Sequence, residues 1–325
     1  MPAPFSRRGL MTAAAALPLA GLALRTADAS APKLTTQIPA WYRFNVGAFQ
    51  ATVVSDGPLP LGEPSAGFPT APKAELERLL TGNFLPLSGI TLEQNALVLN
   101  TGSQLVLFDT GMGTSELFGK TTGKLLANLR LAGFLPEQFD AVVMTHAHCD
   151  HCWAIMGDDG KPNFPNARYY LTEADLNFWT DESKLSRTDW VKVFVEGARK
   201  NLLPVRDRLT MVRPGQEVLP GVQAIATPGH TVGHVSYLIT SDGKSMLNIG
   251  DLAHHEVLLL QKPTYEFAFD TDPKQAAQSR LRVLPEMARQ RIPLLGYHFP
   301  FPGIGNIAPA GDGFQWYPTP MQLQM

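Results

Sequence analysis

The sequence predicts a mixed α and β fold, and three of its features lead to this prediction. Short apolar runs rich in β-branched residues, typical of buried strands, recur in both halves of the chain. Segments that open with helix-capping residues stand between these runs. No long polar linker divides the chain, so we expect residues 30–325 to form a single domain.

Residues 1–29 are expected to be an export signal and to take no part in the fold. Arg7 and Arg8 stand just before an apolar run over residues 11–24, and Ala27-Asp28-Ala29 offers a cleavage site between small residues. The segment resembles a twin-arginine signal, which predicts a periplasmic or secreted protein. The alternative is an N-terminal membrane anchor, but the apolar run is short for a span.

The charge of the chain argues against nucleic acid as a partner. The signal segment carries a net charge of +2, so its removal changes the formal net charge from −2 to about −4. No basic tract remains that could bind nucleic acid or an anionic membrane surface. We therefore expect no stable membrane association once the signal is removed.

The first half of the domain is expected to contain strands and short helices. Residues 41–53 alternate apolar and polar side chains before a turn at Asp56-Gly57-Pro58, which predicts a strand. Residues 59–72 are rich in proline and glycine and have no period, which predicts a long functional loop. The other elements expected in this half are a helix over 74–80, strands over 95–100 and 104–109, a helix over 119–131, strands over 139–144 and 168–171, and a helix that opens with Thr172-Glu173-Ala174-Asp175.

The second half is expected to repeat this arrangement. Asp272-Pro273 supplies an N-cap acid and a proline at the first helical position, which predicts a helix that Pro285 should end or kink. The strands expected here cover 222–226, 235–239, 246–249 and 294–296, and the second and third of them form a hairpin.

The residues that could bind a metal begin where a predicted strand ends, at Thr145-His146-Ala147-His148-Cys149-Asp150-His151. In an extended chain, His146 and His148 project to the same side, so both rings can reach one cation. Asp150 and His151 follow at the turn and can face a neighbouring site. The motif therefore favours two metal ions over one.

Cys149 and Cys152 are the two cysteines of the chain. Their C-x-x-C spacing is also typical of a redox pair or a disulfide in an exported protein. A disulfide at this point would twist the loop that aims the neighbouring ligands. We therefore expect two reduced or buried thiols.

The metal-binding motif resembles the signature of the metallo-β-lactamase superfamily, and the other parts of that signature follow in order. They are Asp109-Thr110-Gly111, Thr227-Pro228-Gly229-His230-Thr231-Val232-Gly233-His234, Gly250-Asp251 and Gly296-Tyr297-His298. Residues 163–167 and 298–305 look like the corresponding stretches of the methyl parathion hydrolase group, with its lactonases and arylesterases. The resemblance covers nearly the whole mature chain and implies an αββα sandwich, one form of the α+β class.

The resemblance also implies two divalent metal ions and a full set of ligands. The ligands implied for the first ion are His146, His148 and His230, those for the second are Asp150, His151 and His298, and Asp251 would bridge the two ions. Asp109 and His234 would support these ligands from behind, because an imidazole keeps its tautomer only when its far N–H has an acceptor. Zinc is favoured, and manganese, cobalt and iron remain alternatives because the same donor set serves them all.

The activity that the resemblance implies is hydrolysis of a small neutral lactone, aryl ester or organophosphate triester. A metal-bound hydroxide, held with the help of Asp150 and Asp251, would attack the carbonyl carbon or the phosphorus. The positions expected in the substrate pocket are Phe118, Trp179, Phe194 and His254. The sequence does not rank a lactone above a phosphotriester, and it leaves a homodimer open.

Three rival interpretations are less well supported. A β-lactamase of this superfamily generally lacks an aspartate at the position of Asp251. A persulfide dioxygenase, which is a mononuclear iron oxidoreductase on a similar scaffold, would use fewer ligands than this chain offers. A metal-storing or substrate-binding protein without turnover is disfavoured because the ligand set is complete.

Overall fold

Two β-sheets of seven strands each form the centre of the computed structural model, which describes residues 39–323. In spatial order, the first sheet contains β1 (Trp41–Val46), β2 (Phe49–Ser55), β5 (Asn95–Asn100), β6 (Leu105–Phe108), β7 (Ala141–Val143), β8 (Arg168–Thr172) and β9 (Leu209–Val212). The second sheet contains β10 (Glu217–Leu219), β11 (Val222–Ala226), β12 (Val235–Ser241), β13 (Lys244–Gly250), β14 (Leu294–Gly296), β15 (Ile304–Ala310) and β16 (Gly313–Pro318).

The remaining elements cover the sheets or extend beyond them. A separate two-stranded ribbon pairs β3 (Leu59–Gly62) with β4 (Ile90–Leu92). The α-helices are α1 (Pro64–Gly67), α2 (Lys73–Gly82), α3 (Leu125–Leu131), α4 (Cys149–Cys152), α5 (Glu173–Thr180), α6 (Trp190–Leu202), α7 (Leu258–Gln261) and α8 (Pro273–Gln290). Three 3₁₀ helices also occur: η1 (Pro136–Gln138), η2 (Glu182–Ser186) and η3 (Leu203–Arg208).

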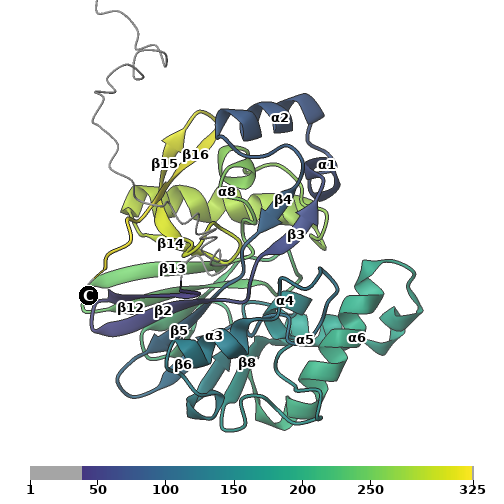
Figure 1. The fold of residues 1–325 in the computed structure, drawn as a ribbon, viewed down its shortest axis with the longest axis vertical. Helices are drawn as coiled ribbons and strands as arrows, with labels where there is room; N and C mark the ends of the chain where they lie inside the picture. Colours follow the sequence, from purple (N-terminus) through teal and green to yellow (C-terminus); the bar gives the residue numbers. More distant parts are fainter. Residues whose placement is uncertain (1–38, 324–325) are drawn as a thin grey trace, which may run out of the picture. The chain divides into compact units, whose positions relative to one another are not determined.

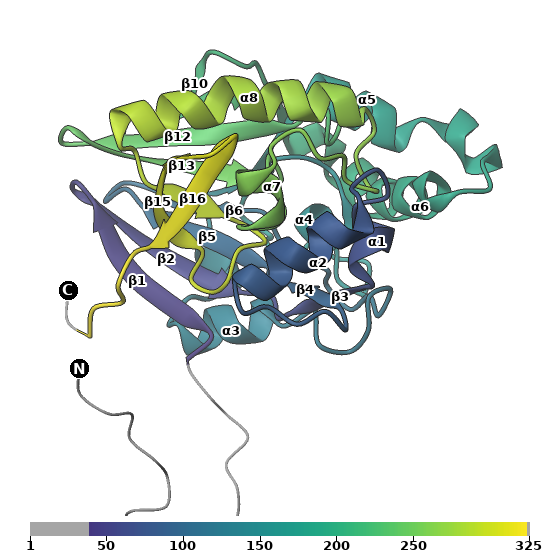
Figure 2. The ribbon, with the colours of Figure 1, turned by 90° about the horizontal axis from the view of Figure 1, so that it is seen from above.

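The two sheets lie face to face, with helices on their outer sides. Figure 1 shows the sheets stacked, and Figure 2 shows α8 across the second sheet and α3 beneath the first. The αββα sandwich implied by the resemblance is confirmed. The export signal proposed for residues 1–29 lies outside the described residues.

Alternation along the strands accounts for this layering. In β5, Leu97 and Leu99 join the core between the sheets, whereas Ala96 and Val98 join the core under the outer helices. Successive side chains of a strand point to opposite faces, so a sheet that is covered on both sides must be apolar on both. This is why the strands of the first half appear in the sequence as nearly continuous apolar runs.

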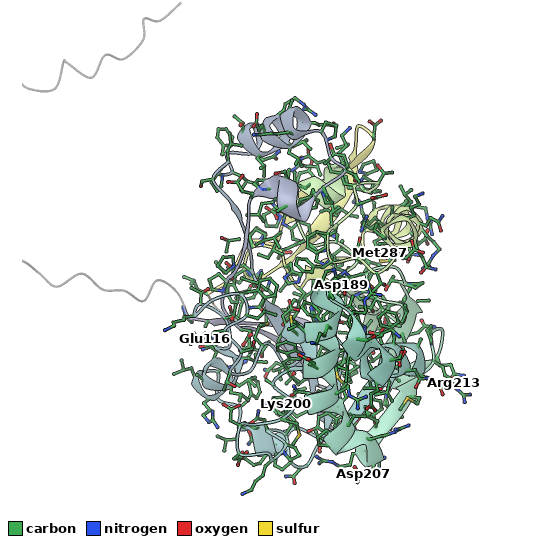
Figure 3. All side chains as sticks on the ribbon, turned by 90° about the vertical axis from the view of Figure 1, so that its right-hand side faces the viewer. Glu116, Asp189, Lys200, Asp207, Arg213 and Met287 are labelled. Carbon is green, nitrogen blue, oxygen red and sulfur yellow. The ribbon has the colours of Figure 1, made fainter. Side chains whose placement is uncertain are left out.

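The exterior is polar, and it carries charges of both signs. Exposed acidic and basic side chains are spread over the face drawn in Figure 3, among them Glu116, Asp189, Lys200, Asp207 and Arg213. Within residues 39–323, no helix combines the length and the apolar character that crossing a membrane requires.

Two predictions for the N-terminal part of the domain are wrong. The single strand expected over 41–53 is a hairpin, because the chain turns at Gly47 with a φ of 59° and β1 then pairs with β2. Only glycine fits there, since a Cβ on Gly47 would lie 1.9 Å from the carbonyl oxygen of Ser241. The loop expected over 59–72 contains β3 and α1, whose pattern is too short to show a period.

One helix prediction is wrong, and another is narrowed. The helix expected over 119–131 begins only at Leu125. Of the two outcomes expected at Pro285, an end of the helix is excluded, because α8 continues to Gln290. A proline inside a helix removes one N–H, but packing of the same turn can compensate for that loss. Val283 and Leu284 are buried immediately before Pro285 and pack in the core under α8.

A buried carboxylate, Asp56, ties together the loops that follow β2 and β6. Its Oδ2 accepts hydrogen bonds from the backbone N–H groups of Met112 (2.8 Å) and Gly123 (3.2 Å), and its Oδ1 accepts one from Leu125 (2.7 Å). Burial raises the pKa of Asp56 to about 7, although these three donors partly offset the effect.

We expect the variant Asp56→Asn to gain stability relative to the wild type as the pH rises from about 4 to about 7. Over this interval the carboxyl group of Asp56 keeps its proton in the folded wild type. In the unfolded chain, where the pKa of an aspartate is about 3.9, that proton has been lost. The stability of the wild type therefore falls as the pH rises, whereas asparagine does not titrate. Urea unfolding of both proteins across this range measures the difference, and a difference independent of pH would contradict the expectation.

Candidate metal centre

The neighbouring parallel strands β6 and β7 both lead directly into the site. Asp109 follows β6 with a φ of 61°, a left-handed conformation that aspartate tolerates better than most residues. Its Oδ1 accepts a hydrogen bond from the N–H of Thr145 (2.8 Å), the first residue of the metal-binding motif. Its Oδ2 lies 3.0 Å from Nδ1 of His151. Asp109 thus supports a ligand in the way that the resemblance implied.

The other predicted ligands come from loops of the second sheet. His230 lies between β11 and β12, Asp251 follows β13, and His298 follows β14. Because β13 and β14 are parallel neighbours, their carboxyl ends lie at one edge of the sheet and bring Asp251 close to His298.

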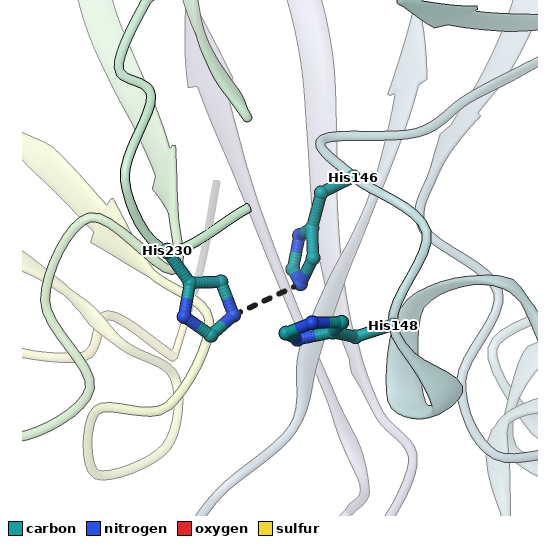
Figure 4. A group of neighbouring side chains, drawn as sticks. All are labelled: His146, His148 and His230. Atoms are coloured by element: carbon teal, nitrogen blue, oxygen red, sulfur yellow. Dashed lines mark hydrogen bonds between the residues drawn. The ribbon is translucent and has the colours of Figure 1, made fainter. Parts of the chain in front are cut away.

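The first group of predicted ligands consists of three buried imidazoles. Figure 4 shows His146, His148 and His230 converging from loops that lie far apart in the sequence. One nitrogen from each ring lies within 4.8 Å of the others, and Nε2 of His146 is 3.2 Å from Nε2 of His230. This arrangement brings together three imidazole nitrogens, the kind of ligand that zinc and similar ions bind.

The second group contains Asp150, His151 and His298, together with Asp251. Nε2 of His298 lies 3.3 Å from Oδ2 of Asp150, and Nε2 of His151 lies 3.3 Å from Oδ1 of Asp251. The other oxygen of Asp251, Oδ2, is 3.2 Å from Nε2 of both His298 and His230. Asp251 therefore faces both groups, which is the position that a bridging ligand needs.

Several buried nitrogen and oxygen atoms of the predicted ligands have no hydrogen-bond partner, which indicates that these side chains suit bound cations. Nε2 of His148, Nε2 of His151 and Oδ1 of Asp251 are buried and accept or donate no hydrogen bond. Buried polar atoms are costly unless something satisfies them, and these three belong to the two groups of predicted ligands. Two divalent ions would satisfy them.

Electrostatics favours positive charge at the same place. Burial lowers the pKa values of His146 and His148 well below their ordinary value, so both rings are neutral and their lone pairs are free to bind a metal. For His230, burial also opposes protonation, but Asp251 and Asp270 outweigh it and raise the pKa to about 9. A ring that holds a proton this tightly between carboxylates lies where a cation is stabilised.

Two further side chains hold the ligands in place. His234, which was predicted to have a supporting role, accepts a hydrogen bond at Nε2 from the backbone N–H of Asp251 (2.9 Å). Asp270 was not predicted, and its Oδ1 lies 2.9 Å from Nδ1 of His230. His230, His254 and Asp270 could hold an ion by distance alone. However, Asp270 is engaged with the outer nitrogen of His230, so it orients that ring instead.

A cavity adjoins the two groups of predicted ligands, and His148, Asp150, His230, Asp251 and His298 line it. Its walls are largely apolar and are formed by Leu59, Leu61, Leu92, Phe118, Phe194, Phe267 and Phe269. Among the described residues that line it there is no lysine or arginine. Residues 59–72, which were predicted to be a functional loop, thus supply part of the wall through Leu59 and Leu61 of β3.

Three of the four residues predicted for the substrate pocket line this cavity. Phe118, Phe194 and His254 line the cavity, and Nε2 of His254 lies 3.1 Å from Oδ2 of Asp251. Trp179 does not line it, because its ring is fully buried behind His148, with the two ring centroids 4.7 Å apart. Trp179 therefore packs against a predicted ligand instead of contacting substrate.

Cys149 and Cys152 are both buried and form no disulfide, as expected. The Cys149 side chain lines the cavity next to Asp150. Burial raises the pKa of the Cys149 thiol well above its ordinary value, so the thiol stays protonated and unreactive.

Comparison with known proteins agrees with this geometry. The family model of the metallo-beta-lactamase superfamily matches residues 89–288. An N-acyl homoserine lactonase from Bacillus cereus is 25% identical over 191 residues, which are 58% of this chain and 68% of the relative.

Two solved structures resemble most of the chain. The first is AidC, described as a dizinc quorum-quenching lactonase in complex with a product, with a TM-score of 0.81, 26% identity, and coverage of 87% of this chain and 98% of that one. The second is AbOPH, described as a hydrolase in the beta lactamase superfamily, with a TM-score of 0.82, 30% identity, and coverage of 88% and 100%.

Proposed function

Because the chain belongs to the metallo-β-lactamase superfamily and is a metal-dependent hydrolase, we propose that it hydrolyses small neutral esters, and lactones foremost. One observation carries the proposal: seven buried His and Asp side chains converge beneath a largely apolar cavity that has no lysine or arginine among its described lining residues. The relatives named above include lactonases, which favours a lactone among neutral esters.

The candidate residues would have separate roles in binding the ions and in orienting the ligands. His146, His148 and His230 would hold one divalent ion, the second group would hold the other, and Asp251 would face both. When bound, the ions supply an activated water and polarise the carbonyl of the substrate. Asp109, His234 and Asp270 keep the ligands oriented and so reduce the reorganisation that the reaction needs.

The walls of the cavity select the substrate. Phe118, Phe194 and Phe267 offer apolar surface to an acyl chain or a ring, and a charged group that lay against these walls would lose its hydration without gaining a partner. Among the described residues that line the cavity, His254 is the imidazole that belongs to neither proposed ligand group, and it can hydrogen-bond a substrate oxygen.

Aryl esters and organophosphate triesters are the second candidate substrates. They are neutral as well, and the faces of Phe118 and Phe194 suit an aromatic leaving group. The same donor set would act on a phosphoryl group, since polarising P=O makes the same demand as polarising C=O.

Two further proposals concern the ions and the location of the protein. We propose zinc as the metal, because three imidazoles and a mixed His/Asp group suit it and because a similar solved structure is a dizinc enzyme. Residues 1–29 support a periplasmic or secreted location.

One panel of substrates tests the proposed function. A single zinc-loaded preparation is assayed with a lactone, phenyl acetate, methyl paraoxon and a β-lactam, before and after treatment with a chelator. We expect the highest kcat/KM for the lactone, loss of all hydrolysis after chelation, and recovery when zinc is restored. Fastest turnover of the β-lactam, or hydrolysis that survives complete removal of the metal, would overturn the proposal.

A further inference from the structure

The start of α5 departs from the usual way in which a helix N-terminus is capped. Thr172 is the N-cap, and its Oγ1 accepts a hydrogen bond from the N–H of Asp175 (3.4 Å). In a capping box, the side chain at the position of Asp175 would return to the N-cap backbone. The Asp175 side chain turns away from the helix instead.

The carboxylate of Asp175 is fully buried between two ligand-bearing loops. Its Oδ2 accepts hydrogen bonds from the N–H of Ala147 (3.0 Å) and from Oγ1 of Thr231 (2.9 Å). Its Oδ1 accepts a hydrogen bond from the N–H of Gly233 (2.6 Å). Ala147 stands between His146 and His148, and Thr231 directly follows His230. The carboxylate of Asp175 is therefore hydrogen-bonded to residues that adjoin all three histidines of the first group in the sequence.

A further hydrogen bond joins the start of α5 to the loop that carries His230. Oγ1 of Thr172 donates a hydrogen bond to the carbonyl oxygen of Gly233 (2.8 Å). A Cβ on Gly233 would lie 2.2 Å from that hydroxyl oxygen and 2.7 Å from the N–H of Asp175. The loop can therefore approach α5 this closely only with glycine at position 233.

We propose that Asp175 is a positioning residue for metal binding, which fastens the loop of His146 and His148 to the loop of His230 and so assembles the three-imidazole group. The inference rests on the proposed metal-dependent function. It concerns one of the two ions, because no hydrogen bond among the described residues joins the Asp175 side chain to Asp150, His151 or His298.

Asparagine cannot replace this carboxylate. All three partners of Asp175 donate, whereas an amide offers one acceptor oxygen and one NH₂ group. If the NH₂ group faces Gly233, the N–H of that residue loses its acceptor, and if it faces Ala147, the N–H there does. In the first orientation the His230 loop keeps only its contact through Thr231, and in the second the loop of His146 and His148 loses its contact; either way, a buried donor is left unsatisfied.

The test is the affinity of the apoprotein for each of two zinc ions, measured by competition with a chromophoric chelator. In Asp175→Asn we expect one ion to bind about 10–100-fold more weakly, as is typical when a group behind the ligands is lost, and the other to bind as in the wild type. The weakened ion should be the one held by the imidazoles. Asp175→Asn should therefore cause no further weakening in a His230→Ala background, but should still weaken the remaining ion in a His298→Ala background.

Asp56→Asn is the matched control. Like Asp175, Asp56 is a buried carboxylate that accepts three hydrogen bonds, in its case all from backbone N–H groups. None of these partners adjoins the three imidazoles in the sequence. It should keep wild-type affinity for both ions. If Asp175→Asn does not fold, Thr231→Val removes one of the three donors and should weaken the same ion to a smaller extent.

Wild-type affinity for both ions in the folded variant, or equal weakening of both, would overturn the inference. In the Thr231→Val variant, unchanged binding of both ions would do the same. A wild type that binds two zinc ions but hydrolyses no ester would instead overturn the proposed function and leave the role of Asp175 standing.

Discussion

Replacing Asp251 with alanine is expected to lower kcat/KM for a lactone by more than about 100-fold. Losing a group behind a metal ligand typically costs about 10–100-fold, and Asp251 is proposed as a ligand itself. Its two oxygens face Nε2 of His151 (3.3 Å) and of His230 (3.2 Å), so its removal affects both groups at once. Steady-state kinetics and zinc content of the same preparation measure the effect.

Asp312→Ala is the control for this variant. Asp312 is an exposed aspartate whose nearest cation is Lys262 (3.5 Å), remote from the ligand groups. Its replacement should leave both kcat/KM and zinc content unchanged. Turnover by Asp251→Ala within a few-fold of the wild type would remove Asp251 from the site.

Replacing Arg280 with methionine is expected to lower the free energy of unfolding by about 3–5 kcal/mol. Arg280 lies on α8 and is fully buried, and its guanidinium donates to the carbonyl oxygens of Pro263 (2.7 Å), Leu252 (3.4 Å) and Tyr265 (2.5 Å). It also lies 3.9 Å from Oδ2 of Asp270. Methionine would leave those acceptors unpaired and would remove the guanidinium beside Oδ2 of Asp270.

Urea unfolding of the metal-free proteins measures this effect without a contribution from bound ions. Arg289→Met on the same helix is the control, because Arg289 is exposed and pairs only with Glu286, one turn away. Its denaturation midpoint should stay near that of the wild type. A midpoint for Arg280→Met that is equally close would show that the guanidinium does not hold this region together.

The sequence predicted well the features that depend on local pattern. The strand over 222–226 coincides with β11, and the strand over 95–100 coincides with β5, because each strand shows its own apolar run between turn residues. The candidate ligands can be recognised in the sequence because they stand at strand ends in short motifs. The pairing of β6 with β7, and of β13 with β14, then brings those ends together.

The features that the sequence did not predict depend on contacts between distant residues. Asp270 and Asp175 were indistinguishable from ordinary acids before and within the first turn of a helix, and their partners lie in other loops. Nothing near Arg280 in the sequence shows that its side chain is buried. Trp179 was expected in the pocket because it is an aromatic residue near the site. An aromatic residue there can also pack behind a ligand, as Trp179 does behind His148, and the sequence does not distinguish the two positions.

The number of zinc ions bound per chain tests the central claim most directly. Metal-free protein is titrated with zinc, the bound ions are counted by elemental analysis, and lactone hydrolysis is followed on the same samples. Two ions per chain are expected, with activity that appears as the sites fill. A single ion per chain however much zinc is offered, or activity only with one bound iron, would contradict the account.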